Sequence, residues 1–102
     1  MAADHYRAAT ENGNHVDDPS EDALFVLISG LNGTDDTFVV IQPDADDPAW
    51  SASVAVLNEG GQEIVRRDTS RREHNVAIAT SVNRIAGHLI KWLAARAGQD
   101  TA

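Results

Sequence analysis

The chain lacks cysteine, so disulfide bonds, thiol catalysis and the common structural zinc sites are excluded together. It also lacks a long apolar run, because the longest one covers only residues 23–28, far below the length of a membrane span. Residues 1–15 contain neither a basic segment nor an apolar core, so they do not form a secretory signal. We therefore expect a cytoplasmic protein that does not contact a membrane.

Positive charge is scarce. The chain has 8 basic against 16 acidic residues, which gives a formal net charge of -8. We do not expect nucleic acid as a partner, since binding phosphates requires local positive charge. An excess of acid fits a basic protein partner, a DNA-mimicking role, or solubility alone.

Length and composition predict one folded domain, because the chain has 102 residues of which 42% are hydrophobic. Residues 1–19 are polar without periodicity and are interpreted as a flexible N-terminal arm. The domain is expected over residues 20–98, followed by a disordered tail at residues 99–102.

The element order predicts an α+β fold. Ser20 is typical of a helix N-cap, and apolar residues follow it at helical spacing, although residues 23–29 could also form a buried strand. Strands are expected over residues 37–42, 50–57, 62–67 and 73–79, with a glycine-containing hairpin turn at residues 58–61. A final amphipathic helix begins at Thr80 or Ser81 and ends at Gly98. We predict a four-stranded antiparallel meander with an N-terminal and a C-terminal helix packed on one face.

No motif predicts catalysis or a cofactor. The four histidines are dispersed, and the chain has neither a nucleophile elbow nor a glycine-rich phosphate loop. Asp44, Asp46 and Asp47 resemble part of a calcium loop, but Ala49 and Trp50 break that pattern. We expect a protein that is not an enzyme and that binds neither a metal nor a cofactor.

Charge segregation suggests a binding surface. Residues 35–47 carry five aspartates and no base, and they precede Trp50, while arginines gather around a later turn. Tryptophan and arginine are frequent anchors of protein interfaces. The candidate partner-binding residues are Asp35, Asp36, Asp44, Asp46, Asp47, Trp50, Arg66 and Arg67. The alternative interpretation makes Trp50 a core residue and places the arginines in a solvated turn.

The sheet itself offers a second surface. Its open face needs a partner or a second copy if that face is apolar, and four residues could make it so: Val39, Ile41, Leu57 and Val65.

Three segments, TFVVIQPDADDPAW, GGQEIVRRD and IKWLAARAG, give the chain a resemblance to small actinobacterial α+β proteins. In size, acidity and element order, residues 20–98 are similar to some immunity proteins of polymorphic toxin systems. The resemblance implies a non-catalytic inhibitor that binds and blocks a partner protein. Two alternatives stay open: a structural or regulatory homodimer built across the sheet face, and a small enzyme or ligand carrier with a pocket between sheet and helices.

Overall fold

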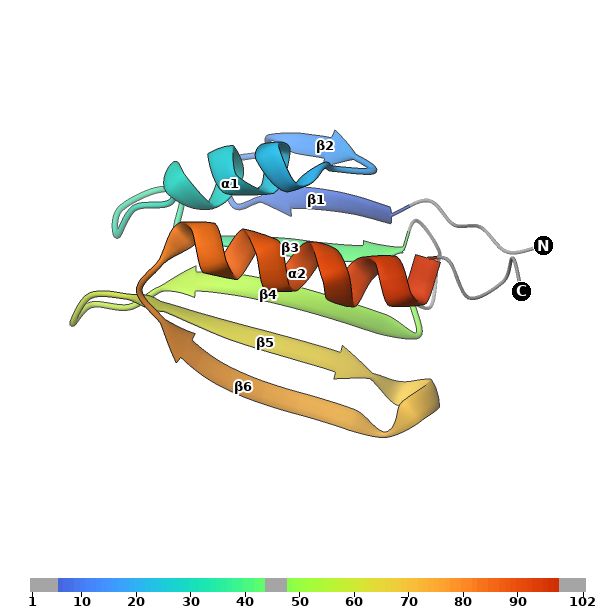
Figure 1. Ribbon diagram of the computed structural model, residues 1–102. Helices are drawn as coiled ribbons and strands as arrows, with labels where there is room; N and C mark the ends of the chain where they lie inside the picture. The colour runs from blue at the N-terminus through green and yellow to red at the C-terminus, as the bar shows by residue number, and fades with distance from the viewer. Residues whose placement is uncertain (1–5, 44–47, 98–102) are drawn as a thin grey trace.

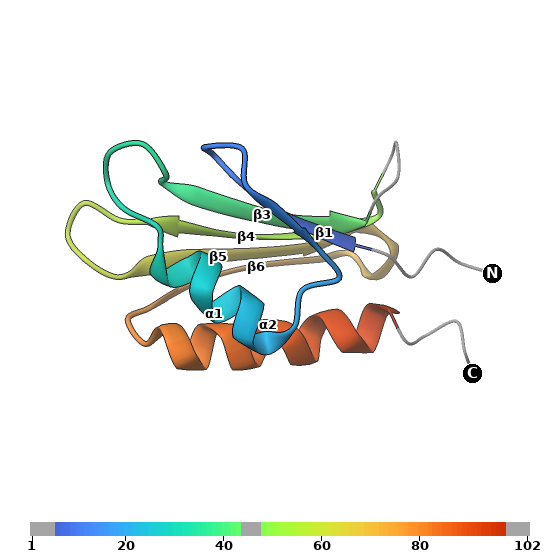
Figure 2. The ribbon, with the colours of Figure 1, turned by 90° about the horizontal axis from the view of Figure 1, so that it is seen from above.

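The computed structural model describes residues 6–43 and 48–97 and arranges them in two layers, a sheet and a pair of helices (Figure 1). The elements are β1 (Tyr6–Thr10), β2 (His15–Asp17), α1 (Glu21–Ser29), β3 (Phe38–Pro43), β4 (Trp50–Val56), β5 (Gln62–Asp68), the short 3-10 helix η1 (Thr69–Arg71), β6 (Glu73–Ala79) and α2 (Val82–Ala97). All neighbouring strands are antiparallel, in the order β2-β1-β3-β4-β5-β6. Figure 2 shows both helices on the same side of the sheet, as expected, with no element on the other side in the described part of the chain.

The predicted four-stranded meander is wrong in its number of strands, since the sheet has six. The two additional strands lie in residues 6–10 and 15–17, which we expected to belong to a flexible arm. A tight turn at Asn12 and Gly13 joins them, with Gly13 at φ 98°. β1 then pairs with β3, so burial against β3 gives this short hairpin the stability that its own composition lacks. Residues 1–5 and 98–102 of the expected arm, domain end and tail lie outside the described residues.

The ambiguous segment at residues 23–29 is a helix, so the strand alternative is wrong. The Ser20 hydroxyl accepts a hydrogen bond from the Ala23 N–H at 3.1 Å, as an N-cap should. Leu24 and Ile28, one turn apart, are the two residues of α1 that are fully buried. The cap and the spacing together favour the helix over the strand.

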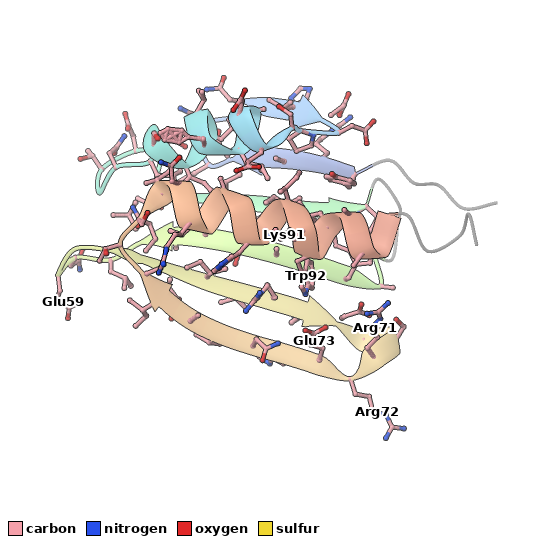
Figure 3. The ribbon with its side chains drawn as sticks, viewed as in Figure 1. Glu59, Arg71, Arg72, Glu73, Lys91 and Trp92 are labelled. Atoms are coloured by element: carbon pink, nitrogen blue, oxygen red, sulfur yellow. The ribbon has the colours of Figure 1, made fainter. Side chains whose placement is uncertain are left out.

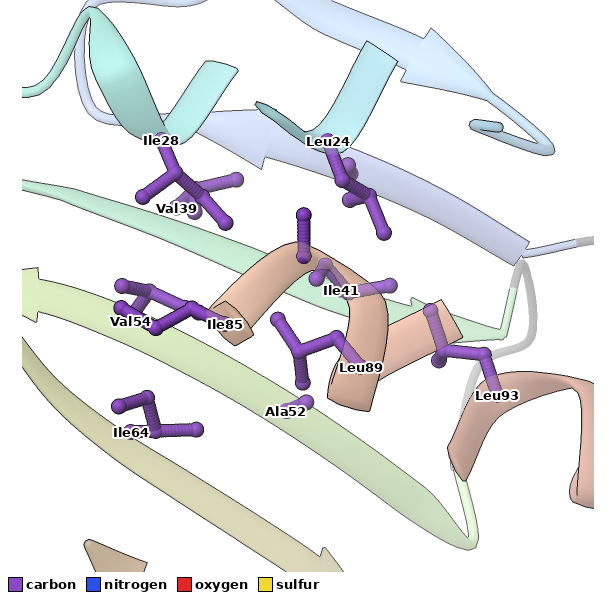
Figure 4. Packing of buried hydrophobic residues seen from close by; sticks show 12 residues of the cluster. Leu24, Ile28, Val39, Ile41, Ala52, Val54, Ile64, Ile85, Leu89 and Leu93 are labelled. Carbon is purple, nitrogen blue, oxygen red and sulfur yellow. The ribbon is translucent and has the colours of Figure 1, made fainter. Parts of the chain in front are cut away.

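The core lies between the sheet and the helices (Figure 4). Its largest apolar side chains come from α1, β3, β4 and α2, namely Leu24, Ile28, Val39, Ile41, Val54, Leu89 and Leu93. Val39 and Ile41 therefore face the helices, and the expectation that they could line the open face is wrong. Their parity on β3 decides this, because a strand directs alternate residues to opposite faces.

The C-terminal helix is confirmed, and α2 buries the predicted stripe that includes Ile85, Leu89 and Leu93. Burial of each such side chain stabilises the fold by about 1.5–3 kcal/mol. Gly87 faces α1, where an added Cβ would lie 3.4 Å from the Glu21 carboxylate.

Candidate functional site

Trp50 lies on the helix side of the sheet, inside an aromatic cluster. Its ring is edge-on to Tyr6 at 5.8 Å and to Trp92 at 5.7 Å between centroids. It is half-buried and packs against the core. These contacts fit the interpretation of Trp50 as a core residue.

The two predicted acidic residues that the structure describes, Asp35 and Asp36, do not lie beside Trp50. Asp35 and Asp36 precede β3, and the backbone of Thr37 accepts a hydrogen bond from the Val56 N–H at the far end of β4. Val56 lies six positions after Trp50 along the extended β4, a distance of about 20 Å. Asp35 is exposed, whereas Asp36 is buried with its Oδ1 atom unpartnered. Asp44, Asp46 and Asp47 lie outside the described residues.

Arg66 and Arg67 occupy opposite faces of the sheet, because they are consecutive residues of β5. Arg66 pairs with Ala52 on the helix side, and Arg67 pairs with Ser51 on the open side. The predicted pair of arginines therefore belongs to two different surfaces: Arg67 to the uncovered face of the sheet and Arg66 to the face that packs against the helices.

The turn between β5 and β6 is built around a buried carboxylate. Asp68 is 2% exposed and accepts hydrogen bonds from the Ser70 N–H at 3.1 Å and the Ser70 hydroxyl at 2.6 Å. Arg71 lies 3.8 Å from its other oxygen, and Arg72 follows in the left-handed region at φ 54°. Figure 3 shows the two arginines at this end of the sheet, while Glu59 projects at the opposite end.

The open face is the side of the sheet that neither helix covers. Its apolar residues lie in adjacent cross-strand rows and comprise Ala9, Phe38, Val40, Ala55, Val65, Val76 and Ile78. Three of them are notably exposed for their size: Phe38 at 38%, Val76 at 58% and Ile78 at 68%. An apolar surface that crosses several strands is typical of an interaction site.

Charges at the margins of the open face balance one another. Arg7 and Asp17 form an ion pair at 2.8 Å across β1 and β2. On β5, Glu63 and Arg67 lie on either side of Val65, at alternate positions of the same face. The open face is thus close to neutral in a chain whose net charge is -8.

A hollow, called the α2 groove, lies between α2 and the β5–β6 edge and has a volume of about 150 Å³. α2 covers the middle of the sheet (Figure 1), and beside it β6 lines the groove with the small residues Ala77 and Ala79. Its apolar lining consists of Ile64, Ala77, Ala79, Ile85 and Leu89.

Three basic side chains, Arg66, Arg84 and His88, complete the lining of the α2 groove. None of the three makes a side-chain hydrogen bond or ion pair with a described residue, and the Nε atom of Arg66 is buried without a partner. The sequence analysis assigned neither Arg84 nor His88 to a site. It missed the groove because helical spacing alone does not show where the sheet extends beyond the helix.

A polar contact joins α2 to β6 nearer the β5–β6 turn. Figure 3 shows Trp92 of α2 directed toward Glu73 of β6, and the indole N–H lies 3.5 Å from the Glu73 carboxylate. The amide of Asn75 also donates to that carboxylate, at 3.0 Å. Glu73 is therefore held by its own hydrogen bonds.

Two groups away from the groove have displaced pKa values. Thr37 donates to Glu11 through its hydroxyl at 2.6 Å and its N–H at 2.9 Å, and these bonds lower the pKa of the Glu11 carboxyl below its ordinary 4.5. Burial, and secondarily the charge of Asp18, raises the pKa of Tyr6 above 10.0. Tyr6 begins β1 and Glu11 follows its end, so both groups lie outside the α2 groove.

Within residues 6–43 and 48–97, no group of three or more histidines and carboxylates is placed to hold a metal ion. None of the described helices is long and apolar enough to cross a membrane. Comparison with known proteins gives no relative: no protein-family profile, no curated protein and no solved structure matches this chain. The resemblance to immunity proteins therefore stays a prediction.

Proposed function

We propose that the chain is a non-catalytic protein-binding domain and that its binding surface is the open face of the sheet. The observation that carries this proposal is the exposure of Val76 and Ile78 beside half-buried Val65, on a face without a covering helix. Covering these side chains would remove apolar area from water at about 25 cal/mol per Å².

The occupant that best fits the open face is a second copy of the chain. Glu63 and Arg67 flank Val65 on one strand, so a two-fold axis through Val65, running across the strands, would set each Glu63 against the Arg67 of the other copy. Facing sheets pack about 10 Å apart, which the two long side chains can span. This self-complementarity also avoids the repulsion that two chains of net charge -8 would meet elsewhere.

Self-association is tested by sedimentation velocity over a wide concentration range. We expect a reversible dimer that Ile78→Lys converts to a monomer, since a lysine there would be buried against an apolar surface. Val26→Lys is the matched control, because Val26 on α1 is also 68% exposed but lies on the other side of the molecule. A chain that is monomeric at every concentration, or a dimer that survives Ile78→Lys, would refute this mode of binding.

Charge reversal tests the orientation of the two copies. Glu63→Arg and Arg67→Glu, made singly, would each set like charges against one another and weaken the dimer. The double reversal would restore opposite charges and recover most of the loss. If the double variant is as weak as the sum of the single ones, the two-fold arrangement is wrong even where a dimer forms.

The inhibitor of a basic partner that the immunity-protein resemblance implies would use the acidic residues instead. Its test is recovery of partners from native extracts at low and high salt, with Asp35→Asn as the variant. Salt-sensitive capture that Ile78→Lys leaves intact would favour the acidic surface over the open face.

A further inference from the structure

The α2 groove combines an apolar floor with a cluster of cations, a composition that differs from both the core and the rest of the surface. Arg66 and Arg84 are two of the 8 basic residues in the chain, and both line this one groove together with His88. The remaining charge of the chain is predominantly acidic, so the groove is a local positive region in a negative field.

The cations in the groove are available for binding. Neither guanidinium is engaged by a carboxylate among the described residues, and the nearby Glu73 carboxylate is held by Trp92 and Asn75. Burial of the Arg66 Nε atom without a partner leaves part of that guanidinium desolvated, which strengthens its interaction with an anion.

The apolar floor of the α2 groove favours an anion that carries an apolar part. Ile64, Ile85 and Leu89 offer no hydrogen bonds to the oxygens of a fully polar anion such as phosphate. Alanines at positions 77 and 79 leave the space open on the β6 side, and a hollow of about 150 Å³ is comparable with apolar cavities that hold a ring of about six carbons. An aliphatic chain of similar size would fit along the floor.

From this geometry we infer that the α2 groove binds a small aliphatic carboxylate, with its carboxylate at Arg66, Arg84 and His88 and its chain on the apolar floor. Arginine suits this role because its planar fork pairs with both carboxylate oxygens. The groove is lined by α2 and lies on the helix side of the sheet, so this inference does not depend on the open face or on self-association.

Titration with hexanoate, followed by the amide shifts in a ¹H–¹⁵N spectrum, tests the inference. We expect saturable shifts at Ala77, Ala79 and the Arg84–Leu89 part of α2, with an affinity in the millimolar range for a ligand of this size. Hexanol, hexylammonium and acetate are the matched probes, which lack the charge, reverse it, or lack the chain. Each of them should bind at least about tenfold more weakly.

Variants separate the groove from unspecific binding. Arg66→Gln and Arg84→Gln should each weaken hexanoate about tenfold, the loss expected for one charge-assisted bond. Arg67→Gln is the control, since it removes the same charge from the adjacent residue on the opposite face and should leave the affinity unchanged. If Arg66→Gln disturbs the fold, the exposed Arg84 still provides the test.

Three results would overturn the inference: no saturable shift with hexanoate, equal affinity for hexanol, or an affinity that Arg84→Gln leaves unchanged. The two sites lie on opposite faces of the sheet, so the two proposals are tested separately. Whether Ile78→Lys abolishes the dimer decides only the proposed function, and hexanoate binding decides only this inference.

Discussion

Replacing Trp50 by alanine should destabilise the domain strongly. Substitutions of this kind cost about 3–5 kcal/mol in a core, and we expect about 3 kcal/mol because the side chain is half-buried. The edge-on contacts with Tyr6 and Trp92 are each worth about 0.5–1.5 kcal/mol of that loss. With domain stabilities of about 5–15 kcal/mol, the melting temperature should fall by roughly 12–24 °C.

Urea unfolding followed by circular dichroism measures this change without using the tryptophan signal that the substitution removes. Trp50→Phe is the control, since it keeps an aromatic ring between Tyr6 and Trp92 and should lose about 1 kcal/mol. A loss below about 1 kcal/mol for Trp50→Ala would show that Trp50 is not part of the core and would return it to the candidate binding residues.

Substitutions at three further positions test other parts of the structure. Gly87→Ala should stabilise the domain by about 0.5–1 kcal/mol in urea unfolding, because the mid-helix glycine meets only a flexible side-chain end; destabilisation would mean that the α1–α2 contact is tighter than 3.4 Å. The carboxyl of Glu11 should titrate below 4.5 in a ¹³C NMR titration, so its contribution to stability is present above the unfolded pKa and is lost as the pH falls through the folded one. Thr37→Val should raise that pKa part of the way back by removing the hydroxyl donor, and an unchanged value would contradict the assigned cause. Asp68→Ala should cost about 1–3 kcal/mol and Asp68→Asn less, since the η1 donors lose both acceptor oxygens in the first and keep one in the second; equal losses would argue against a hydrogen-bonding role.

Strong periodicity made part of the fold predictable. Local sequence patterns predicted three features: the apolar stripe of α2, the glycine turn before β5 and the alternation of β6. The β1–β2 hairpin was missed because its strands are short and nearly without large apolar residues, and they depend on β3 for burial. Asn12-Gly13 was the available signal, since that dipeptide is the strongest short-range indication of a hairpin.

Less of the two candidate surfaces than of the fold could be predicted from the sequence, and the reason differs between the surfaces. Val65 was expected on the open face, but Val39 and Ile41 have the wrong parity, and only the register of β3 against β4 reveals it. The α2 groove could not be predicted, because it depends on β6 extending past the helix layer. The spacing of residues within α2 carries no information about that tertiary arrangement. Arg66 was chosen for its charge, whereas its significance comes from the hollow that it lines together with Ala77 and Ala79 of β6.

β6 connects the two proposals, because its alternate residues have different sizes on the two faces. Val76 and Ile78 are large where the sheet has no cover, and Ala77 and Ala79 are small where α2 could have packed. A strand that served only to complete the core would show the reverse, with large residues toward the helix and polar ones toward water. This inverted pattern is best explained if both faces of β6 bind something outside the chain. A variant that exchanges it, with Val76→Thr and Ile78→Thr on one face and Ala77→Val on the other, should fill the groove, lose both dimer and hexanoate, and keep or raise its stability against urea. A clear loss of stability in that variant would show that the pattern serves the fold and not binding.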